Sequence, residues 1–297
     1  MQGAAIRTDL HSLLKVLRSF IAGIGFAEVC VARGFNKARQ ILRNDGVLAL
    51  ASAFSRSFRR RLLDASSRRA YAEIQTIAAS NRSSAKKFTR IYKKKLWLRV
   101  NPVINADQSL SGQGSTLEST AIFRQELERF LLQVNARRLL DIPCGDFNWM
   151  KSVKIPSGLE YIGGDIVPSL VAQLNEAYGR LSEELPRHFR VFDLTKDRFD
   201  AADIWLCKDC IQHLSNEDIF LALRNFCRSS VEYALISNHT DVLENTDIPT
   251  GGFRHVDLTL PPFNLPVPLI KLSDAPIDRE QRYIGVWRRK DLIRLLC

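Results

Sequence analysis

Short apolar runs recur through the second half of the chain, and a polar or Gly-bearing turn follows each of them. The runs that are typical of buried strands cover residues 137–142, 160–167, 189–194, 203–207, 233–237 and 282–288. Helical patterns stand between them: Pro168 begins one helix, and Ser215 with Asp218 caps another. Strands that alternate with helices at this spacing indicate an α/β fold, in which a mostly parallel, doubly wound sheet carries helices on both faces.

Two further segments of the same region carry local signals. Ser115 and Glu118 form a capping-box pattern, which predicts a helix over residues 116–133. The stretch 263–276 is rich in Pro and therefore cannot be a central strand. We expect it to form a loop that covers the site.

The N-terminal part has a different pattern and a different charge. Leucines and isoleucines recur at helical spacing from Leu10 to Ile24, and basic helical pieces follow at 37–43 and 56–64. Residues 1–100 hold 21 Lys and Arg against 5 Asp and Glu, whereas residues 101–297 hold 22 against 27. We therefore divide the chain into a basic helical extension, 1–82, and a domain, 83–297.

The basic extension is compatible with several roles. Basic amphipathic helices bind anionic membrane surfaces, but they also pack on a domain and leave a solvated basic face. An organellar transit peptide and a nucleic-acid anchor are weaker alternatives, the latter because aromatic residues are sparse here. No run reaches the roughly 20 apolar residues of a membrane span. Six scattered Cys indicate a reducing compartment. We expect a cytoplasmic protein, with peripheral attachment to a membrane as the alternative.

Chemistry-bearing residues gather at the ends of the expected strands. Ligands of open α/β sheets bind at the carboxyl ends of the strands, near the point where strand order reverses. All five of the first strands end there in polar or Gly-bearing sequence, at 141–147, 163–165, 193, 207–213 and 237–241.

The first two of these turns suit a nucleoside. Gly145 directly after a strand lets the backbone approach a ligand, and Asp165, 24 residues after Asp141, is placed to accept hydrogen bonds from ribose hydroxyls. A dinucleotide fingerprint has three glycines, and here Pro143 and Phe147 stand at the other two places. NAD and FAD are therefore disfavoured, and S-adenosylmethionine is favoured.

The sequence also resembles a known family. "LLDIPCGDF" (139–147) is similar to the first motif of class I S-adenosylmethionine-dependent methyltransferases, and "ADIWLCKDCIQHLSNEDI" (202–219) is similar to their fourth. Between about residues 88 and 290 the chain is closest to an uncharacterised bacterial-type subgroup. The residues that carry this resemblance are Tyr92, Trp97, 111–116, "PCGDFNWM" (143–150), Asn245, Asp247, Gly251, Arg254, Pro262 and Phe263.

The resemblance implies a seven-stranded Rossmann-like sheet and S-adenosylmethionine as the cofactor. It implies that Asp141 and Gly145 line the methionine part, that Asp165 binds the ribose, and that Asp193 and Leu194 flank the adenine. The full set of cofactor-binding candidates is Asp141, Pro143, Cys144, Gly145, Asp146, Asp165, Ile166, Asp193, Leu194 and Lys208.

The acceptor side is expected after the fourth and fifth strands. Methyl transfer needs an aligned acceptor and, for oxygen or nitrogen, a base. The candidate bases are Asp209, His213 and His239. The candidate acceptor-binding residues are Trp97, Asn245, Asp247 and Arg254. A structural role is the alternative for each: His213 in a hydrogen bond, Arg254 in an ion pair.

The function predicted from these residues is methyl transfer to an unidentified acceptor, an oxygen of a small molecule, a saccharide or a lipid-linked glycan. A nucleic-acid methyltransferase and a domain that binds the cofactor without turnover are the alternatives. Cys207 and Cys210 have metal-ligand spacing, but no second pair of ligands is at hand, so we expect no metal.

Overall fold

A computed structural model describes residues 65–100, 109–179, 187–274 and 282–296. The helical and basic patterns of residues 1–64 lie outside the described residues. The compact unit that contains the sheet begins at Ser66, whereas the sequence had placed the start of the domain at residue 83. The difference arises from a helix over residues 65–78. Its Ala70, Ile74 and Ile77 are buried in the same core as the sheet.

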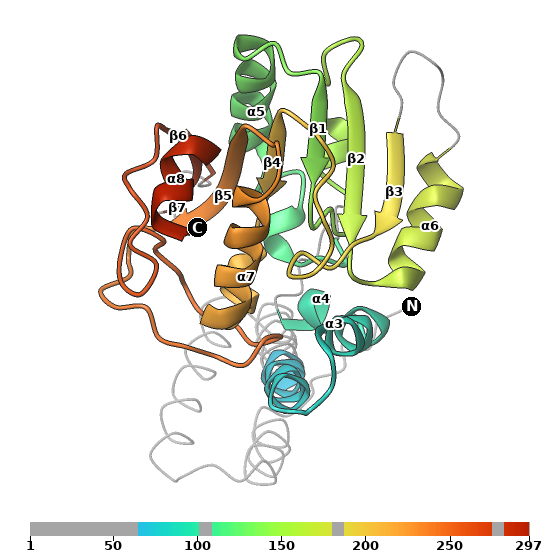
Figure 1. The fold of residues 1–297 in the computed structure, drawn as a ribbon. Coiled ribbons are helices and arrows are strands. Elements are labelled where there is room, and N and C mark those ends of the chain that lie inside the picture. The colour runs from blue at the N-terminus through green and yellow to red at the C-terminus, as the bar shows by residue number, and fades with distance from the viewer. Residues whose placement is uncertain (1–64, 101–108, 180–186, 275–281, 297) are drawn as a thin grey trace, which may run out of the picture. The chain divides into compact units, whose positions relative to one another are not determined.

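The centre of this unit is a seven-stranded sheet (Figure 1). Its strands are β1 Arg138–Asp141, β2 Glu160–Asp165, β3 Arg187–Val191, β4 Ile204–Cys207, β5 Tyr233–His239, β6 Ile270–Ser273 and β7 Arg282–Arg288. The order across the sheet is β3-β2-β1-β4-β5-β7-β6. The pairs from β3 to β5 are parallel, while β7 runs antiparallel to both β5 and β6. The expected doubly wound, mostly parallel seven-stranded sheet is confirmed.

Helices flank this sheet and precede it. They are α3 Ser84–Lys93, α4 Leu96–Val100, α5 Ala121–Gln133, α6 Pro168–Tyr178, α7 Asn216–Cys227 and α8 Arg289–Leu296. The predicted helix starts at Pro168 and Ser215 are confirmed: Pro168 opens α6, and Ser215 Oγ accepts a hydrogen bond from the Asp218 amide at 3.2 Å. Capping leaves fewer unpaired donors in the first turn of α7.

The predicted helix over residues 116–133 begins later than expected. α5 starts at Ala121, and residues 113–115 form a short 3-10 turn instead. The capping-box prediction was wrong, and Ser115 O, the first carbonyl that a helix capped by Ser115 would use, is bound by a side chain from another segment. Gly114 O accepts from Lys208 Nζ, and Ser115 O accepts from Asn148 Nδ2, both at 3.1 Å.

The Pro-rich stretch 263–276 is only partly a loop. Its residues 270–273 form β6, which pairs with β7 alone. The prediction that this stretch is not a central strand is confirmed, since β6 is the last strand of the order. Pro266 and Pro268 lie before the first paired residue, where no ladder hydrogen bond is lost.

The sheet fixes where a site can form. Strand order reverses between β1 and β4, so the carboxyl ends of these two strands border a crevice. In Figure 1 the strands β1 and β2 point toward α3 and α4. After their first residues, Arg138 and Glu160, both strands are buried up to Asp141 and Asp165, whose carboxyls stand where this crevice opens.

Candidate functional site

One cavity lies at the carboxyl ends of the parallel strands. Its empty volume is about 930 Å³ including the space open to solvent at its mouth, within the usual range for small-molecule sites. Twelve of the residues singled out in the sequence line it: Trp97, Asp141, Pro143, Cys144, Gly145, Asp165, Ile166, Asp193, Leu194, Lys208, Asp209 and His213. The fold thus brings together residues that are up to 116 positions apart in the chain.

The turn after β1 is held from both sides. Ile142 N donates to Leu206 O of β4 at 2.9 Å, and Cys144 N donates to Gly164 O of β2 at 2.8 Å. Gly145 has φ +56°, and a Cβ there would stand 2.5 Å from Ser111 Oγ. The backbone therefore reaches the cavity wall at a place where a side chain has no room.

Phe147, which stands where the resembled family has a glycine, anchors this turn. Its ring contacts those of Tyr161, Tyr178 and Phe189 at centroid distances of 5.1–5.2 Å. A Cβ on Gly163 would lie 2.7 Å from the Phe189 ring. Where the glycine pattern is broken at Phe147, a buried cluster of aromatic rings supports the turn instead.

Asp165 sits at the end of β2 with both oxygens engaged. Oδ2 accepts from the Gly145 amide at 3.2 Å and Oδ1 from the Val167 amide at 3.0 Å. Burial raises the pKa of this carboxyl to about 6, although the amides oppose the shift. A carboxylate has further lone pairs beyond these two bonds, so Asp165 can still accept from a ligand's hydroxyls.

Asp141 ends β1 and is equally buried. Its Oδ2 accepts from the Tyr161 hydroxyl at 2.6 Å. Burial raises its pKa to about 7, the nearby Asp165 charge adds to the shift, and the Tyr161 hydrogen bond counteracts it. Two buried carboxyls with raised pKa values on one cavity wall are typical of a binding or catalytic site.

Asp193 marks the opposite end of the cavity. Its Oδ1 accepts from the Thr195 hydroxyl at 2.7 Å, and its Oδ2 pairs with Lys196 at 2.8 Å. Partial burial raises its pKa, but the hydrogen bonds from Lys196 and Thr195 outweigh that effect and lower the pKa below its ordinary value. Leu194 and Phe192 add an apolar surface beside it.

Asp146 does not line the cavity but holds part of its cover. We call residues 109–116 the roof segment. Ser109 Oγ and the Leu110 amide both donate to Asp146 Oδ2, at 2.8 and 2.6 Å, and Ser111 Oγ donates to Oδ1 at 3.1 Å. Tyr92 of α3 extends the same network to Ser111 at 2.8 Å. The carboxylate thus fixes the roof segment over the turn that contains Gly145.

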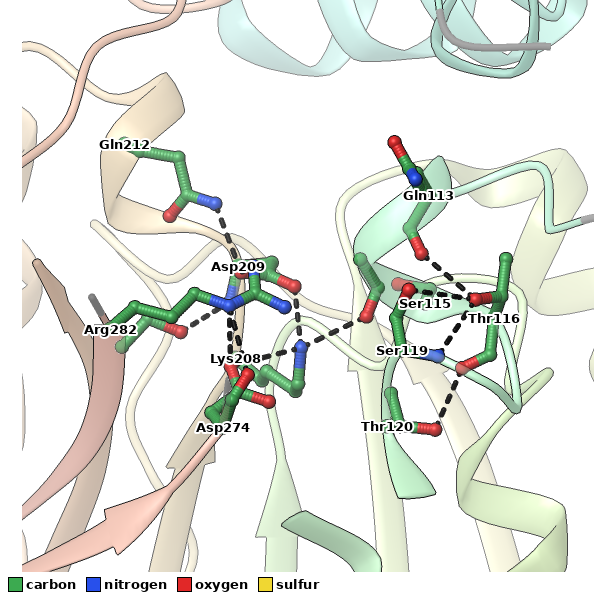
Figure 2. Close-up of polar contacts among 12 residues, drawn as sticks. Gln113, Ser115, Thr116, Ser119, Thr120, Lys208, Asp209, Gln212, Asp274 and Arg282 are labelled. Carbon is green, nitrogen blue, oxygen red and sulfur yellow. Dashed lines mark hydrogen bonds and ion pairs between the residues drawn. The ribbon is translucent and has the colours of Figure 1, made fainter. Parts of the chain in front are cut away.

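A buried ion cluster anchors the other end of the roof segment (Figure 2). Lys208 Nζ donates to Asp209 Oδ2 at 2.5 Å and to Gly114 O at 3.1 Å. Arg282 NH1 lies 3.2 Å from Asp209 Oδ1, and its Nε lies 3.2 Å from Asp274 Oδ2. Burial raises the pKa of Asp209, but the Arg282 and Lys208 charges prevail and hold it far below its ordinary value. Such a carboxylate stays ionised and is a weak proton acceptor.

His213 presents one free nitrogen. Its Nδ1 lies 2.8 Å from Gly252 O, and because a carbonyl only accepts, Nδ1 carries the proton. No described residue forms a hydrogen bond with Nε2, which is then a lone-pair acceptor. Burial lowers the pKa of His213, and Arg254 adds to this, while the Gly252 hydrogen bond and Asp209 oppose it. The ring is therefore neutral at physiological pH.

The remaining candidates lie away from the cavity. His239 is buried and stacks on His255 at 4.3 Å. Asn245 Nδ2 donates to Asp257 O at 2.7 Å and to Pro261 O at 2.9 Å. Arg254 donates to Leu214 O at 2.5 Å, and Asp247 accepts from the Asn216 amide at 2.7 Å. These contacts tie the segment after β5 to the sheet and to α7.

Several residues that line the cavity were not among the candidate site residues of the sequence. They are Ser84, Phe88, Tyr92, Ser111, Ser115, Ile142, Trp149, Phe192, Thr195, Cys210, Leu214 and Asp218. Phe88 and Tyr92 are four residues apart on α3, a spacing that places them on one helix face. That spacing was visible in the sequence, but it does not tell which element the face packs against.

No metal centre or membrane span occurs in the part of the chain that the structure describes. No group of three or more His, Cys, Asp and Glu side chains there is arranged to hold a metal ion. Every helix there is too short or too polar to cross a bilayer. Cys207 is buried, Cys210 lines the cavity, and both thiols are free.

Comparisons with known proteins give only distant likenesses. No family model and no curated protein matches the chain. Among solved structures, magnesium protoporphyrin IX methyltransferase (ChlM) from Synechocystis PCC 6803 with bound SAH is 13% identical, at a TM-score of 0.46 over 68% of this chain and 92% of that one. PigF with SAH is 15% identical, at a TM-score of 0.48 over 76% of this chain and 68% of that one. The mitomycin 7-O-methyltransferase MmcR is 17% identical, at a TM-score of 0.47 over 74% of this chain and 67% of that one. The strand order of the sheet itself, rather than these likenesses, defines the fold.

Proposed function

We propose that this chain is an S-adenosylmethionine-dependent methyltransferase. The observation that carries the proposal is the pair formed by Gly145 and Asp165 at the reversal of strand order. A close-approach glycine beside a buried carboxylate suits a ribose, and the turn lacks the further glycines that a pyrophosphate needs. The methyltransferase motifs in the sequence support the same interpretation.

The residues of the cavity fit the parts of this cofactor. Asp165 would accept hydrogen bonds from the ribose hydroxyls, Leu194 and Phe192 would cover the adenine, and the wall near Asp141 and Gly145 would hold the methionine part. When bound, the cofactor supplies an electrophilic methyl group on a sulfonium. The chain's own task is to align an acceptor with that methyl and to exclude water.

His213 is the residue best suited to receive the acceptor's proton. It lines the cavity, its Nδ1–H is fixed by Gly252, and Nε2 is free to accept. Asp209 and His239 are less suited: Asp209 is held ionised by Arg282 and Lys208, and His239 lies away from the cavity. We assign Asp209 a positioning role, since its ion pairs and Lys208 hold the roof segment in place.

Calorimetry with S-adenosylmethionine and S-adenosylhomocysteine tests the proposal. We expect both ligands to bind the wild type, and Asp165→Ala to weaken binding by about 10- to 100-fold, because several hydrogen bonds to one charged group are lost. Asp241→Ala is the control, since Asp241 is an exposed carboxylate outside the cavity. Absence of binding to the wild type would refute the proposal.

A further inference from the structure

The part of the cavity beyond the β1 turn is walled by aromatic rings. The Tyr92 and Trp97 rings meet edge to face at 5.0 Å, and the Phe88 and Trp97 rings lie 6.0 Å apart. The Trp97 ring continues to the His213 ring at 5.2 Å. All four residues line the cavity. We call Phe88, Tyr92 and Trp97 the aromatic wall, and His213 lies beside it.

The polar groups beside the aromatic wall are largely engaged within the chain. Ser111 Oγ binds Tyr92 OH and Asp146, while Lys208 and Asp209 bind each other. Lys208 also binds the roof segment, and Asp209 also pairs with Arg282. Among the described cavity-lining residues of α3, α4, the roof segment and the loop after β4, three side-chain hydrogen-bond acceptors form no hydrogen bond within the chain: His213 Nε2 and the hydroxyls of Ser84 and Ser115.

The small number of open polar groups limits how many hydroxyls a bound acceptor can carry. A sugar ring carries hydroxyls on all sides, and each one buried without a partner is costly. No carboxylate, amide or guanidinium of this part of the lining is free to satisfy them. A flat apolar molecule with one reactive hydroxyl needs only one hydrogen-bond partner, which His213 can supply. Its faces can pack against the rings of Trp97 and Tyr92.

The pKa of the proposed base, His213, favours the same class of acceptor. Burial keeps the pKa of His213 below its ordinary value, with Arg254 adding to the effect and Asp209 opposing it. An aromatic hydroxyl has a pKa of about 10, as in tyrosine, whereas a saturated hydroxyl is, like water, far less acidic. A neutral imidazole is far better matched to the more acidic of these protons.

We infer that the acceptor is a neutral, flat aromatic compound that is methylated on a phenolic hydroxyl held between the aromatic wall and His213 Nε2. This inference rests on the proposed function. In the reaction the phenolic oxygen forms a bond to the methyl carbon as the carbon–sulfur bond breaks. The electron pair of that bond stays on sulfur, which becomes a neutral thioether, and the phenolic proton passes to His213 Nε2 and then to water.

The first test compares acceptors of matched size on the full chain. With radiolabelled S-adenosylmethionine we expect methyl transfer to 2-naphthol at a rate at least 10-fold above that to decahydro-2-naphthol, its saturated counterpart, or to a methyl hexoside. Equal or faster transfer to the saturated alcohol or to the sugar would overturn the inference. So would absence of naphthol binding and transfer in a protein that binds S-adenosylhomocysteine normally. If S-adenosylhomocysteine itself did not bind, the proposed function would be refuted instead.

Variants of Trp97 and His213 distinguish the binding role of the aromatic wall from the proton-accepting role of His213. Trp97→Leu should weaken naphthol binding to the S-adenosylhomocysteine complex at least 10-fold, whereas Tyr71→Leu, a change at an exposed ring that does not line the cavity, should not. His213→Gln should leave naphthol binding within about 3-fold but slow transfer about 100-fold or more. A nitro-substituted phenol, whose proton is more acidic, should recover part of the lost rate. An equal loss for both phenols, or unchanged binding in Trp97→Leu, would contradict the assignment.

Discussion

The proposed cofactor site depends most on the carboxyl of Asp165. Burial raises its pKa to about 6, and the nearby Asp146 charge adds to the shift. A group of this kind is charged at neutral pH but takes up a proton in mild acid. If Asp165 binds the ribose as we propose, its charged form is the better acceptor of the ribose hydrogen bonds, and ligand binding therefore depends on pH.

Affinity for S-adenosylhomocysteine should fall as the pH is lowered through about 6. The carboxylate form of Asp165 binds, so affinity is lost in proportion as the group is protonated, approaching about tenfold per pH unit well below the pKa. Calorimetry between pH 5 and 8 measures this. The titratable groups that face Asp165 are Asp141, Asp146, Tyr92 and Cys144, and burial raises the pKa of the last two, which keeps them neutral across this range.

The control for this experiment is Asp165→Asn. It should bind weakly at all pH values and show a flatter pH profile, because the amide does not titrate. A profile as steep in Asp165→Asn as in the wild type would assign the titration to Asp141 instead.

At the scale of elements, the roof segment is an unusual part of the site. It has little regular structure, yet Asp146 fixes it at one end and Lys208 at the other. It is therefore held by charge-assisted hydrogen bonds rather than by a strand or helix. A segment of this kind can loosen as a unit when one of its two anchors is removed.

Asp146→Asn should loosen the roof segment without unfolding the sheet. An amide offers one acceptor oxygen where the carboxylate accepts from Ser109, Leu110 and Ser111, and an unmet hydrogen bond costs about 1–3 kcal/mol locally. Faster hydrogen exchange of the Leu110 amide, together with weaker S-adenosylhomocysteine binding, is the expected result. Glu126→Gln, an exposed change on α5, is the control. Unchanged exchange at Leu110 would show that Asp146 does not hold the segment.

At the scale of the whole molecule, the fold is stabilised by one continuous core, and its buried acids work against that stability. Asp141 has a pKa of about 7 in the folded chain against an ordinary value near 4. The folded state thus binds this proton more tightly than the unfolded state. The contribution of Asp141 to stability is full below pH 4 and is lost as the pH rises through 7.

Asp141→Asn should therefore make the protein more stable at pH 8, by about 1–3 kcal/mol. The amide oxygen that this change introduces can still accept from the Tyr161 hydroxyl, so the hydrogen bond is kept while the buried charge is removed. Urea unfolding at pH 8 and pH 5 measures the effect. The advantage should shrink at pH 5, where the wild-type carboxyl is protonated, and a variant that is less stable than the wild type at pH 8 would contradict the argument.

The local pattern of the sequence was enough to predict the strands and most of the turns that carry chemistry. Buried parallel strands are continuous apolar runs, so the strand at 203–207 could be recognised without the fold. The gathering of Asp141, Gly145 and Asp165 around one cavity followed from the rule that strand ends meet at one edge. These inferences need only neighbours in sequence and the general geometry of a parallel sheet.

Long-range contacts decided the rest. The capping pattern at Ser115 did not begin a helix, and the Ser115 carbonyl that would accept the first helical hydrogen bond is bound by Asn148, 33 positions later. Asp146 looked like a cofactor residue but binds the roof segment, and Asp209 looked like a base until Arg282 was placed beside it. Sequence determined which residues stand at the strand ends, because that depends on local hydrophobic pattern. Tertiary structure alone decided which of them remain free to act, because a polar group's availability depends on partners that the chain brings in from far away.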